Sequence, residues 1–224
     1  MTSTQSRSIL ITGFGPFPGM PINVSAQIAE RLCNAARERW QQHHFEVREL
    51  PTEWIAGPET LQKLWDELRP DIALHFGVSS QAQGLQLETK AHNNCRMDPD
   101  AAGALPLSAI RIAGGGDVRV TPLAFDAIMR RLQVLRIPSC ISDDAGAYLC
   151  NAILYDSIER ASASRPEALT GFVHIPSQLA LQRLDDAGQT TSLMSIDDVV
   201  VGGLAILECT LEQLEQVRKK LHHL

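Results

Sequence analysis

The sequence predicts an α/β domain in which helices cover both faces of a mainly parallel sheet. Three observations lead to this class. Short apolar runs, typical of fully buried strands, alternate with longer segments whose apolar residues recur at helical spacing. Glycine, proline and helix-capping residues separate these segments. No internal repeat, low-complexity tract or linker interrupts the 224 residues, so we expect a single domain over residues 1–224.

Each expected strand is a short run that ends at or just before a glycine, a proline or a polar residue, and the first, third and last of the runs are largely apolar. The runs cover residues 8–12, 45–50, 71–77, 137–142 and 171–175. A glycine-rich loop, 13–19, follows the first of them. The stretch 79–117 lacks helical periodicity and is rich in polar residues and glycines, which predicts irregular structure there.

Each expected helix has a start signal followed by an apolar stripe. Asn23 is the expected cap of the first helix, and Pro58 opens the second at its first position. A third helix starts at Thr121-Pro122 and runs to Leu135, and Ser195 caps the last one. The helix that carries Cys150 is expected to begin near Tyr148, because Gly146 interrupts the pattern before it.

Composition and charge exclude several classes of protein. The net charge of −6 and the lack of a basic cluster beyond Arg218-Lys-Lys220 argue against a nucleic-acid binder. The polar first residues predict no secretory signal, and no apolar run is long enough to cross a bilayer. Five cysteines with irregular spacing and no Cys-x-x-Cys pair argue against a disulfide framework and a structural zinc site. We therefore expect a cytoplasmic protein.

Cys150 and His174 are the candidate nucleophile and base. A cysteine in the first turn of a helix faces unpaired N–H groups and the positive end of the helix dipole, which favour a thiolate and can bind an oxyanion. His174 stands in the apolar strand 171–175, and Pro176 ends that strand directly after it. The alternative is that Cys150 is a small buried core residue, the usual fate of a free cysteine. His75, in the strand 71–77, is a competing histidine of the core type.

A third group should orient the imidazole, and a carboxylate is the usual choice. Glu88 lies between apolar residues and can point inward, whereas Asp143 and Asp144 suit a turn or a cap. The glycine loop 13–19 lacks the spacing and the lysine of a phosphate cradle. Its aromatic residues, Phe14 and Phe17, indicate recognition of a flat apolar group instead. No His, Glu or Asp set has metal-ligand spacing on one element, so no metal is expected.

These candidates are expected to meet at one edge of the sheet. Ligands of open α/β sheets bind outside the carboxyl ends of the strands. The glycine loop 13–19, Val78, His174 and Cys150 all follow, or stand close to, the end of an expected strand. The irregular stretch 79–117 is the expected flap over this edge.

Several segments resemble known motifs, in the same order, over nearly the whole chain. They are Gly13-Phe-Gly-Pro-Phe17, Asn23-Val-Ser25, Leu50-Pro-Thr52, Leu87-Glu88 with His92-Asn93, Ser142 to Asn151, and Phe172 to Pro176. Together they are similar to the signatures of pyroglutamyl peptidase type I, the pyrrolidone-carboxylate peptidases of the cysteine-peptidase class. The resemblance implies a three-layer α/β/α sandwich, no cofactor, and a homo-oligomer, either a dimer or a tetramer.

The resemblance also implies a Cys150–His174–Glu88 triad that releases N-terminal pyroglutamate (5-oxoproline) from peptides. Phe14 and Phe17 would form flat walls for the lactam ring. Arg96 matches an arginine of the family and is a candidate for positioning the substrate. Two alternatives remain: a related thiol amidohydrolase for another small lactam or acyl amide, and a catalytically silent binding protein on the same scaffold.

The chain departs from the family pattern at two places. Many bacterial members carry Gly-Gln-Ala-Gly-Gly-Arg after the third strand, where this chain has Gly77-Val-Ser-Ser-Gln81. Val78 cannot replace a glutamine side chain in a hydrogen bond, although Gly-Val-Ser is similar to animal members. The stretch 93–99 also differs in length from the usual bacterial segment. Both departures bear on substrate preference more than on the fold.

Overall fold

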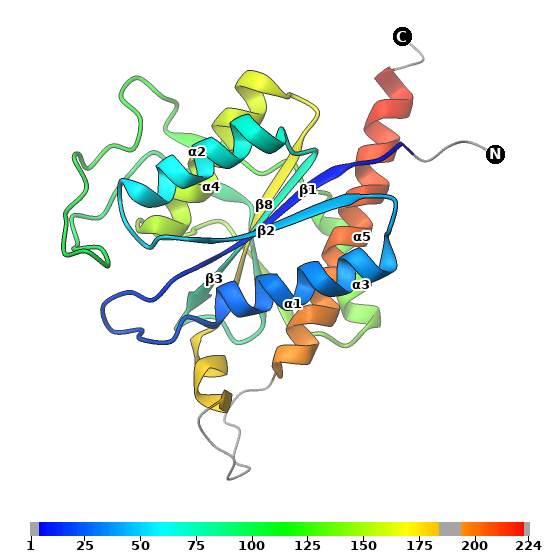
Figure 1. Cartoon of the computed structure of the whole chain (residues 1–224), viewed down its shortest axis with the longest axis horizontal. Coiled ribbons are helices and arrows are strands. Elements are labelled where there is room, and N and C mark those ends of the chain that lie inside the picture. The colour runs from blue at the N-terminus through cyan, green and yellow to red at the C-terminus, as the bar shows by residue number, and fades with distance from the viewer. Residues whose placement is uncertain (1–4, 184–193, 222–224) are drawn as a thin grey trace.

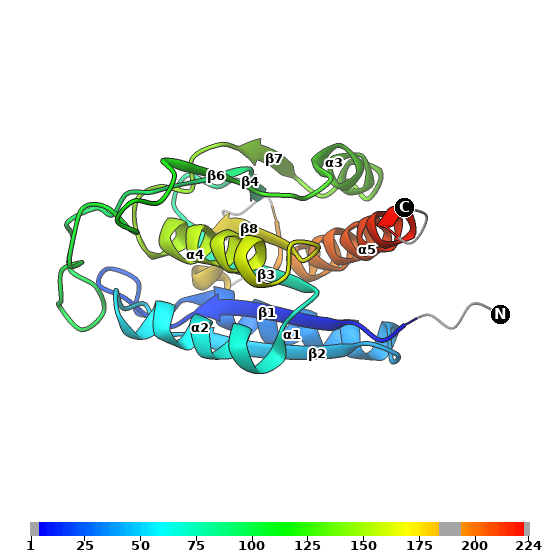
Figure 2. The same ribbon diagram turned by 90° about the horizontal axis from the view of Figure 1, so that it is seen from above.

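The computed structural model describes residues 5–183 and 194–221 and has a mixed, mainly parallel sheet at its centre. The six strands lie in the order β2-β1-β3-β8-β4-β7, which Figure 2 shows from one edge to the other. Only the β4–β8 pair is antiparallel among these neighbours. The strands are β1 (Ser8–Phe14), β2 (His44–Leu50), β3 (Ile72–Ser79), β4 (Leu85–Glu88), β7 (Ser139–Ser142) and β8 (Leu169–Pro176).

Helices cover both faces of the sheet, so the predicted fold class is confirmed. Figure 1 shows α2 and α4 on one side of the strands and α1, α3 and α5 on the other. Their bounds are α1 (Val24–Arg39), α2 (Ala56–Leu68), α3 (Phe125–Val134), α4 (Leu149–Ser164) and α5 (Ile196–Leu221), and a short helix, η1 (Ser177–Arg183), follows β8. Alternate residues of β1 supply the two core layers, since Ile9 and Ile11 pack in the first cluster and Leu10 in the second.

Two helix starts differ from the prediction. Helix α2 begins at Ala56, so Pro58 is its third residue rather than its first. Helix α3 begins at Phe125 instead of Thr121-Pro122. The reason for the second difference is that the Thr121 N–H donates to the Thr89 carbonyl (2.9 Å), which keeps Thr121 extended.

The stretch 79–117 contains strands that the sequence analysis did not predict. Besides β4, it holds β5 (Lys90–His92), which pairs in antiparallel fashion with β6 (Val118–Val120). These strands are too short to produce a recognisable alternation of apolar and polar residues. The remainder, 93–117, is a long loop on the α2 and α4 side of the sheet, drawn in green in Figure 1.

Two findings bear on the expected location of the protein. Among the residues that the structure describes, no helix is both long and apolar enough to traverse a bilayer. The first four residues, which contributed to the expectation of no secretory signal, lie outside the described residues.

Candidate active site

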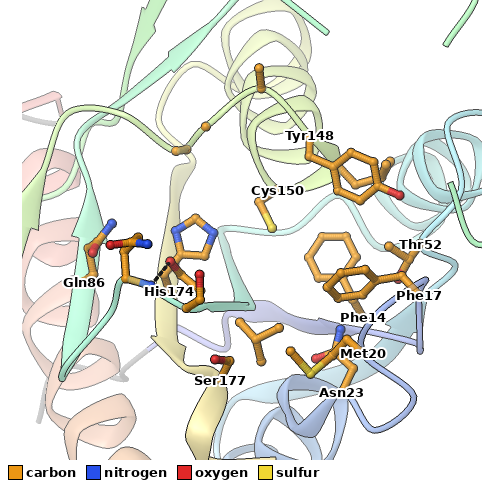
Figure 3. Close-up of a pocket in the computed structure, with 18 of the residues that line it drawn as sticks. Phe14, Phe17, Met20, Asn23, Thr52, Gln86, Tyr148, Cys150, His174 and Ser177 are labelled. Atoms are coloured by element: carbon orange, nitrogen blue, oxygen red, sulfur yellow. Dashed lines mark hydrogen bonds between the residues drawn. The ribbon is translucent and has the colours of Figure 1, made fainter. Parts of the chain in front are cut away.

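The carboxyl ends of the central strands surround a cavity of about 510 Å³. Six of the seven predicted site residues line this cavity, and Figure 3 shows several of them. They are Phe14, Phe17, Val78, Arg96, Cys150 and His174. The seventh, Glu88, is fully buried and lies against His174. The carboxyl ends of β1, β3 and β8 therefore meet the start of α4 at one edge of the sheet, as the topology predicts, and the antiparallel strand β4 adds Gln86 and Glu88.

Cys150 is the second residue of α4, in the first turn of the helix. Gly146 adopts a φ of +79°, and its N–H donates to Oδ1 of Asp144 (2.9 Å), so Asp144 has the turn role that the sequence indicated. Tyr148, at the N-cap, makes no capping hydrogen bond with its side chain. The N–H groups of the first turn have no carbonyl within the helix to bind, and they favour an anion at this end.

Gly77 in β3 lets the Cys150 sulfur approach the sheet. A Cβ atom at this position would lie 3.0 Å from Cys150 Sγ and 2.7 Å from Phe172 Cζ. Carbon atoms in contact are normally about 3.5–4.0 Å apart. A larger residue at position 77 would therefore have to displace the Phe172 ring, the sulfur, or both.

His174 connects Cys150 to Glu88. His174 Nδ1 lies 2.8 Å from Oε1 of Glu88, which leaves Nε2 as the nitrogen available to the Cys150 sulfur. Burial by itself lowers the pKa of His174. The charge of the Cys150 sulfur, its hydrogen bond to the ring, and the Glu88 carboxylate outweigh burial and raise this pKa to about 10. The arrangement thus favours an imidazolium between a sulfur and a carboxylate.

His75, the competing histidine, is a core residue. Its Nδ1 lies 2.8 Å from Thr12 Oγ1, and its Nε2 lies 2.9 Å from Ser157 Oγ. Complete burial lowers its pKa to about 3, so His75 is neutral at ordinary pH. Because both ring nitrogens have hydrogen-bond partners inside the fold, His75 has a structural role.

Aromatic side chains form the wall of the cavity opposite His174 (Figure 3). Phe14 packs against Phe172 with ring centroids 6.1 Å apart, and Phe17 packs against Tyr148 at 6.2 Å. Tyr148 also meets Trp54 edge to face at 5.1 Å. Such rings offer flat apolar faces to a small planar group.

Hydrogen bonds hold the loop that carries Phe17. Thr52 Oγ1 and Asn23 Nδ2 both donate to the Gly15 carbonyl, at 2.8 and 3.0 Å. Asn23 also accepts from the Ser25 N–H and so caps α1, as its position in the sequence predicts.

Arg96 contributes an exposed positive charge to the rim of the cavity. Its guanidinium pairs with Asp98 at 2.5 Å and lies over the Tyr148 ring, 5.7 Å from the centroid. Its backbone N–H donates to the Ala147 carbonyl (2.6 Å), which joins the loop 93–117 to the turn before Cys150. Val78 offers only an apolar surface to the cavity.

Sequence reasoning did not identify the roles of Asn151 and Gln86. Asn151, next to the cysteine, is fully buried; its Oδ1 accepts from the His92 N–H and its Nδ2 donates to the His92 carbonyl, both at 2.8 Å. It therefore fixes β5 on the start of α4. Gln86 lines the cavity, and its Nε2 donates to Glu88 Oε1 at 2.8 Å. A polar residue two positions before Glu88 was the available signal, because alternate strand residues share a face.

The described residues 5–183 and 194–221 contain no group of three or more His, Cys, Asp and Glu side chains placed to hold a metal ion.

Comparisons with known proteins agree with this architecture. Residues 7–213 match the family model described as pyroglutamyl peptidase. The pyrrolidone-carboxylate peptidase of Pyrococcus furiosus is 32% identical over 75% of this chain and 80% of its own length. Pyrrolidone-carboxylate peptidase 1 of Ralstonia nicotianae is 29% identical over 95% of this chain and 96% of its own.

Solved structures give the same result. A mutant pyrrolidone carboxyl peptidase from P. furiosus superposes with a TM-score of 0.81 at 28% identity, over 92% of this chain and 99% of that one. Pyroglutamyl peptidase I of Bacillus amyloliquefaciens gives a TM-score of 0.78 at 26% identity, over 92% and 97% of the two chains. The chain, with its cysteine at a helix start and its histidine at a strand end, belongs to the pyroglutamyl peptidase family of cysteine peptidases.

Proposed function

We propose that the protein hydrolyses the amide bond after an N-terminal pyroglutamyl residue, with Cys150, His174 and Glu88 as its catalytic triad. The observation that carries the proposal is the contact of His174 with Glu88 on one side and with the Cys150 sulfur on the other, in the wall of an aromatic cavity. The family of the chain supports the same substrate class.

The reaction has two steps. In the first, the Cys150 thiolate attacks the pyroglutamyl carbonyl carbon and forms a C–S bond. The tetrahedral intermediate then collapses, the C–N bond breaks, and His174 gives its Nε2 proton to the departing amine. In the second, neutral His174 takes a proton from water, whose oxygen attacks the thioester. Pyroglutamate leaves, and the thiolate–imidazolium pair is restored.

Backbone N–H groups at the start of α4 are the proposed oxyanion donors. They stand in the first helical turn beside the sulfur, where the carbonyl oxygen develops its charge. Removing one well-aimed donor of this kind costs about 2.7–4 kcal/mol in other acyl-transfer enzymes. Glu88 accepts from Nδ1 and so holds the ring in the tautomer that presents Nε2 to the sulfur.

The aromatic wall is the proposed site of the lactam ring. A pyroglutamyl group is small, planar and neutral, and it lacks the α-ammonium that ordinary aminopeptidases bind. Phe14 and Phe17 present flat faces to such a ring, while Val78 adds an apolar contact. Arg96, held at the rim by Asp98 and Tyr148, is proposed to position the substrate.

The test is hydrolysis of pyroglutamyl-7-amido-4-methylcoumarin in the presence of a thiol reductant. We expect the wild-type protein to release coumarin and the Cys150→Ala variant to release none. Prolyl and glutaminyl arylamides serve as controls for the acyl group, and we expect both to be much poorer substrates. Preference for either control would favour the amidohydrolase alternative, and equal activity of Cys150→Ala would refute the assignment of the nucleophile.

We further propose that the protein acts in the cytoplasm as a homo-oligomer. All five cysteines are free thiols, which suits a reducing compartment. In the loop 93–117, Leu107 is 92% exposed and Ile110 is 55% exposed, so these apolar side chains would be better covered by a second copy of the chain. Light scattering on the purified protein, at several concentrations, tests the assembly state.

A further inference from the structure

Gln86 shares a hydrogen-bond acceptor with His174. Gln86 Nε2 donates to Oε1 of Glu88 at 2.8 Å, and this same oxygen lies 2.8 Å from His174 Nδ1. Only an N–H of the amide can donate to a carboxylate, so this contact fixes which end of the Gln86 side chain faces Glu88. We propose that Gln86 is a positioning residue for the reaction, which acts by holding the Glu88 carboxylate in the orientation that His174 requires.

Strand register brings the three side chains onto one face of the sheet. β4 and β8 run antiparallel, and Gln86 is the direct partner of His174. Residues two apart on a strand share a face, which places Glu88 beside Gln86. Leu85 and Leu87, the alternate residues of β4, point into the opposite core and are 0% and 1% exposed. The arrangement is thus a product of the strand pairing and not of a flexible loop.

The two oxygens of the Glu88 carboxylate differ in their hydrogen bonds, and this difference shows why Glu88 needs a second hydrogen-bond donor besides His174. Oε1 accepts from both Gln86 and His174, whereas Oε2 is buried with no hydrogen-bond partner among the described residues. Among the described residues, the hydrogen bonds that set the rotation of the carboxylate are therefore the two to Oε1. Without Gln86, a single contact to the histidine would remain, and the carboxylate could turn about its last torsion.

Gln86 contacts both the cavity and Glu88. It lines the cavity, while Glu88 is fully buried. In Figure 3, Gln86 lies on the opposite side of the His174 ring from Cys150. Gln86 and Cys150 thus lie on different sides of the imidazole, and the contact that links Gln86 to the reacting groups is its hydrogen bond to Glu88.

The inference rests on the proposed function, and Gln86→Met tests it. This substitution keeps the length of the side chain and removes the N–H donor. We expect kcat for the coumarin substrate to fall about 10-fold or more, since hydrogen bonds to charged groups are strong, while KM changes little. Gln133→Met, on the exposed surface of α3, is the matched control and should keep wild-type kinetics. A loss that appears in KM instead would mean that Gln86 binds substrate, and it would overturn the inference.

A double-mutant cycle decides whether Gln86 acts through Glu88. In a Glu88→Ala background, Gln86→Met should cause no further loss of kcat, because its acceptor is already gone. The same loss in both backgrounds would overturn the inference. Gln86→Glu keeps the shape of the side chain but sets a second carboxylate against Glu88, so it should lose at least as much activity as Gln86→Met. Full activity of Gln86→Glu would likewise contradict the proposal.

Alkylation by iodoacetamide separates failure of this inference from failure of the proposed function. The reagent reports on the Cys150–His174 pair and needs no peptide substrate. We expect Gln86→Met to slow alkylation of Cys150 in the folded protein, and Glu88→Ala to abolish the difference. If the wild-type protein alkylates rapidly but releases no coumarin, the proposed substrate is wrong and the alkylation rates still decide the role of Gln86. Alkylation of Gln86→Met at the wild-type rate would overturn that role.

Discussion

Replacing Gly77 by alanine should damage the candidate site more than it damages the fold. The new Cβ would lie 2.7 Å from Phe172 Cζ and 3.0 Å from Cys150 Sγ. Contacts of this kind normally measure about 3.5–4.0 Å, so the ring must retreat by about 1 Å. Phe172 has little room to do so, because it is 1% exposed and its ring centroid lies only 4.8 Å from that of His174.

The expected magnitudes follow from these distances. Forcing one methyl group into a packed core costs about 1–3 kcal/mol, which for a chain of this size lowers Tm by roughly 2–4 °C per kcal/mol. A displacement of about 1 Å at reacting groups can cost up to about 100-fold in rate. We therefore expect Gly77→Ala to remain folded at 25 °C and to lose about 10- to 100-fold in kcat/KM for pyroglutamyl-aminomethylcoumarin.

Gly171→Ala is the matched control for this prediction. Its Cβ would lie 2.4 Å from Leu123 Cδ1, in the core and away from Cys150 and His174. We expect it to lower Tm by a comparable amount but to leave kcat/KM near the wild-type value. Thermal unfolding by circular dichroism and initial rates of coumarin release measure the two effects. Equal losses of activity in both variants, or full activity of Gly77→Ala, would show that the close contacts of position 77 do not control the site.

Four further predictions concern other parts of the structure. The pKa of His174 is raised to about 10, so the imidazolium should lose its proton, and kcat/KM should fall, only as the pH approaches that value. Glu88→Gln should move this fall to lower pH, because Glu88 contributes to the raised pKa. A fall centred on pH 6.5 in the wild-type protein would contradict this expectation. The buried His75 has a pKa lowered to about 3 from 6.5, so only the unfolded chain takes up its proton below pH 6.5. For this group, urea unfolding should therefore show about 1.6 kcal/mol less stability at pH 5 than at pH 6.5, and an unchanged midpoint would be incompatible with a neutral His75. Asn151→Ala should cost about 1–3 kcal/mol in the same assay by leaving the backbone of β5 unpaired, whereas an unchanged stability would show that water replaces the amide. Phe17→Ala should raise KM with little change in kcat, and an unaltered KM would place the lactam ring elsewhere.

The sequence indicated the position of a site residue where that position depends on a single helix or strand. The position of Cys150 depends only on where α4 begins, and Gly146 marks that boundary through its φ of +79°. Likewise, Pro176 marks the end of β8 and places His174 at the sheet edge. In the structure, both ring nitrogens of His75 have hydrogen-bond partners in the core, whereas His174 lines the cavity. The sequence does not show this difference, because both histidines lie in apolar strands.

The sequence was less informative about contacts that depend on the pairing of strands distant in the chain. Glu88 and His174 are far apart in the chain and meet because β4 inserts antiparallel between β8 and β7, which no local pattern reveals. The role of Gln86 follows from the same pairing. Cys209 lies on the last helix, where the sequence alone allows it to face either the core or a subunit interface; in the structure it is 9% exposed and belongs to the core cluster on the inner face of α5.

Capture of the thioester on Cys150 would test the proposed nucleophile and intermediate in one measurement. The wild-type protein would be mixed with the coumarin substrate, quenched in acid within the first turnover, digested, and analysed by mass spectrometry. We expect one pyroglutamyl group on the peptide that contains Cys150, and none in the Cys150→Ala variant. A pyroglutamyl group on another residue, or continued turnover by Cys150→Ala, would contradict the proposed mechanism.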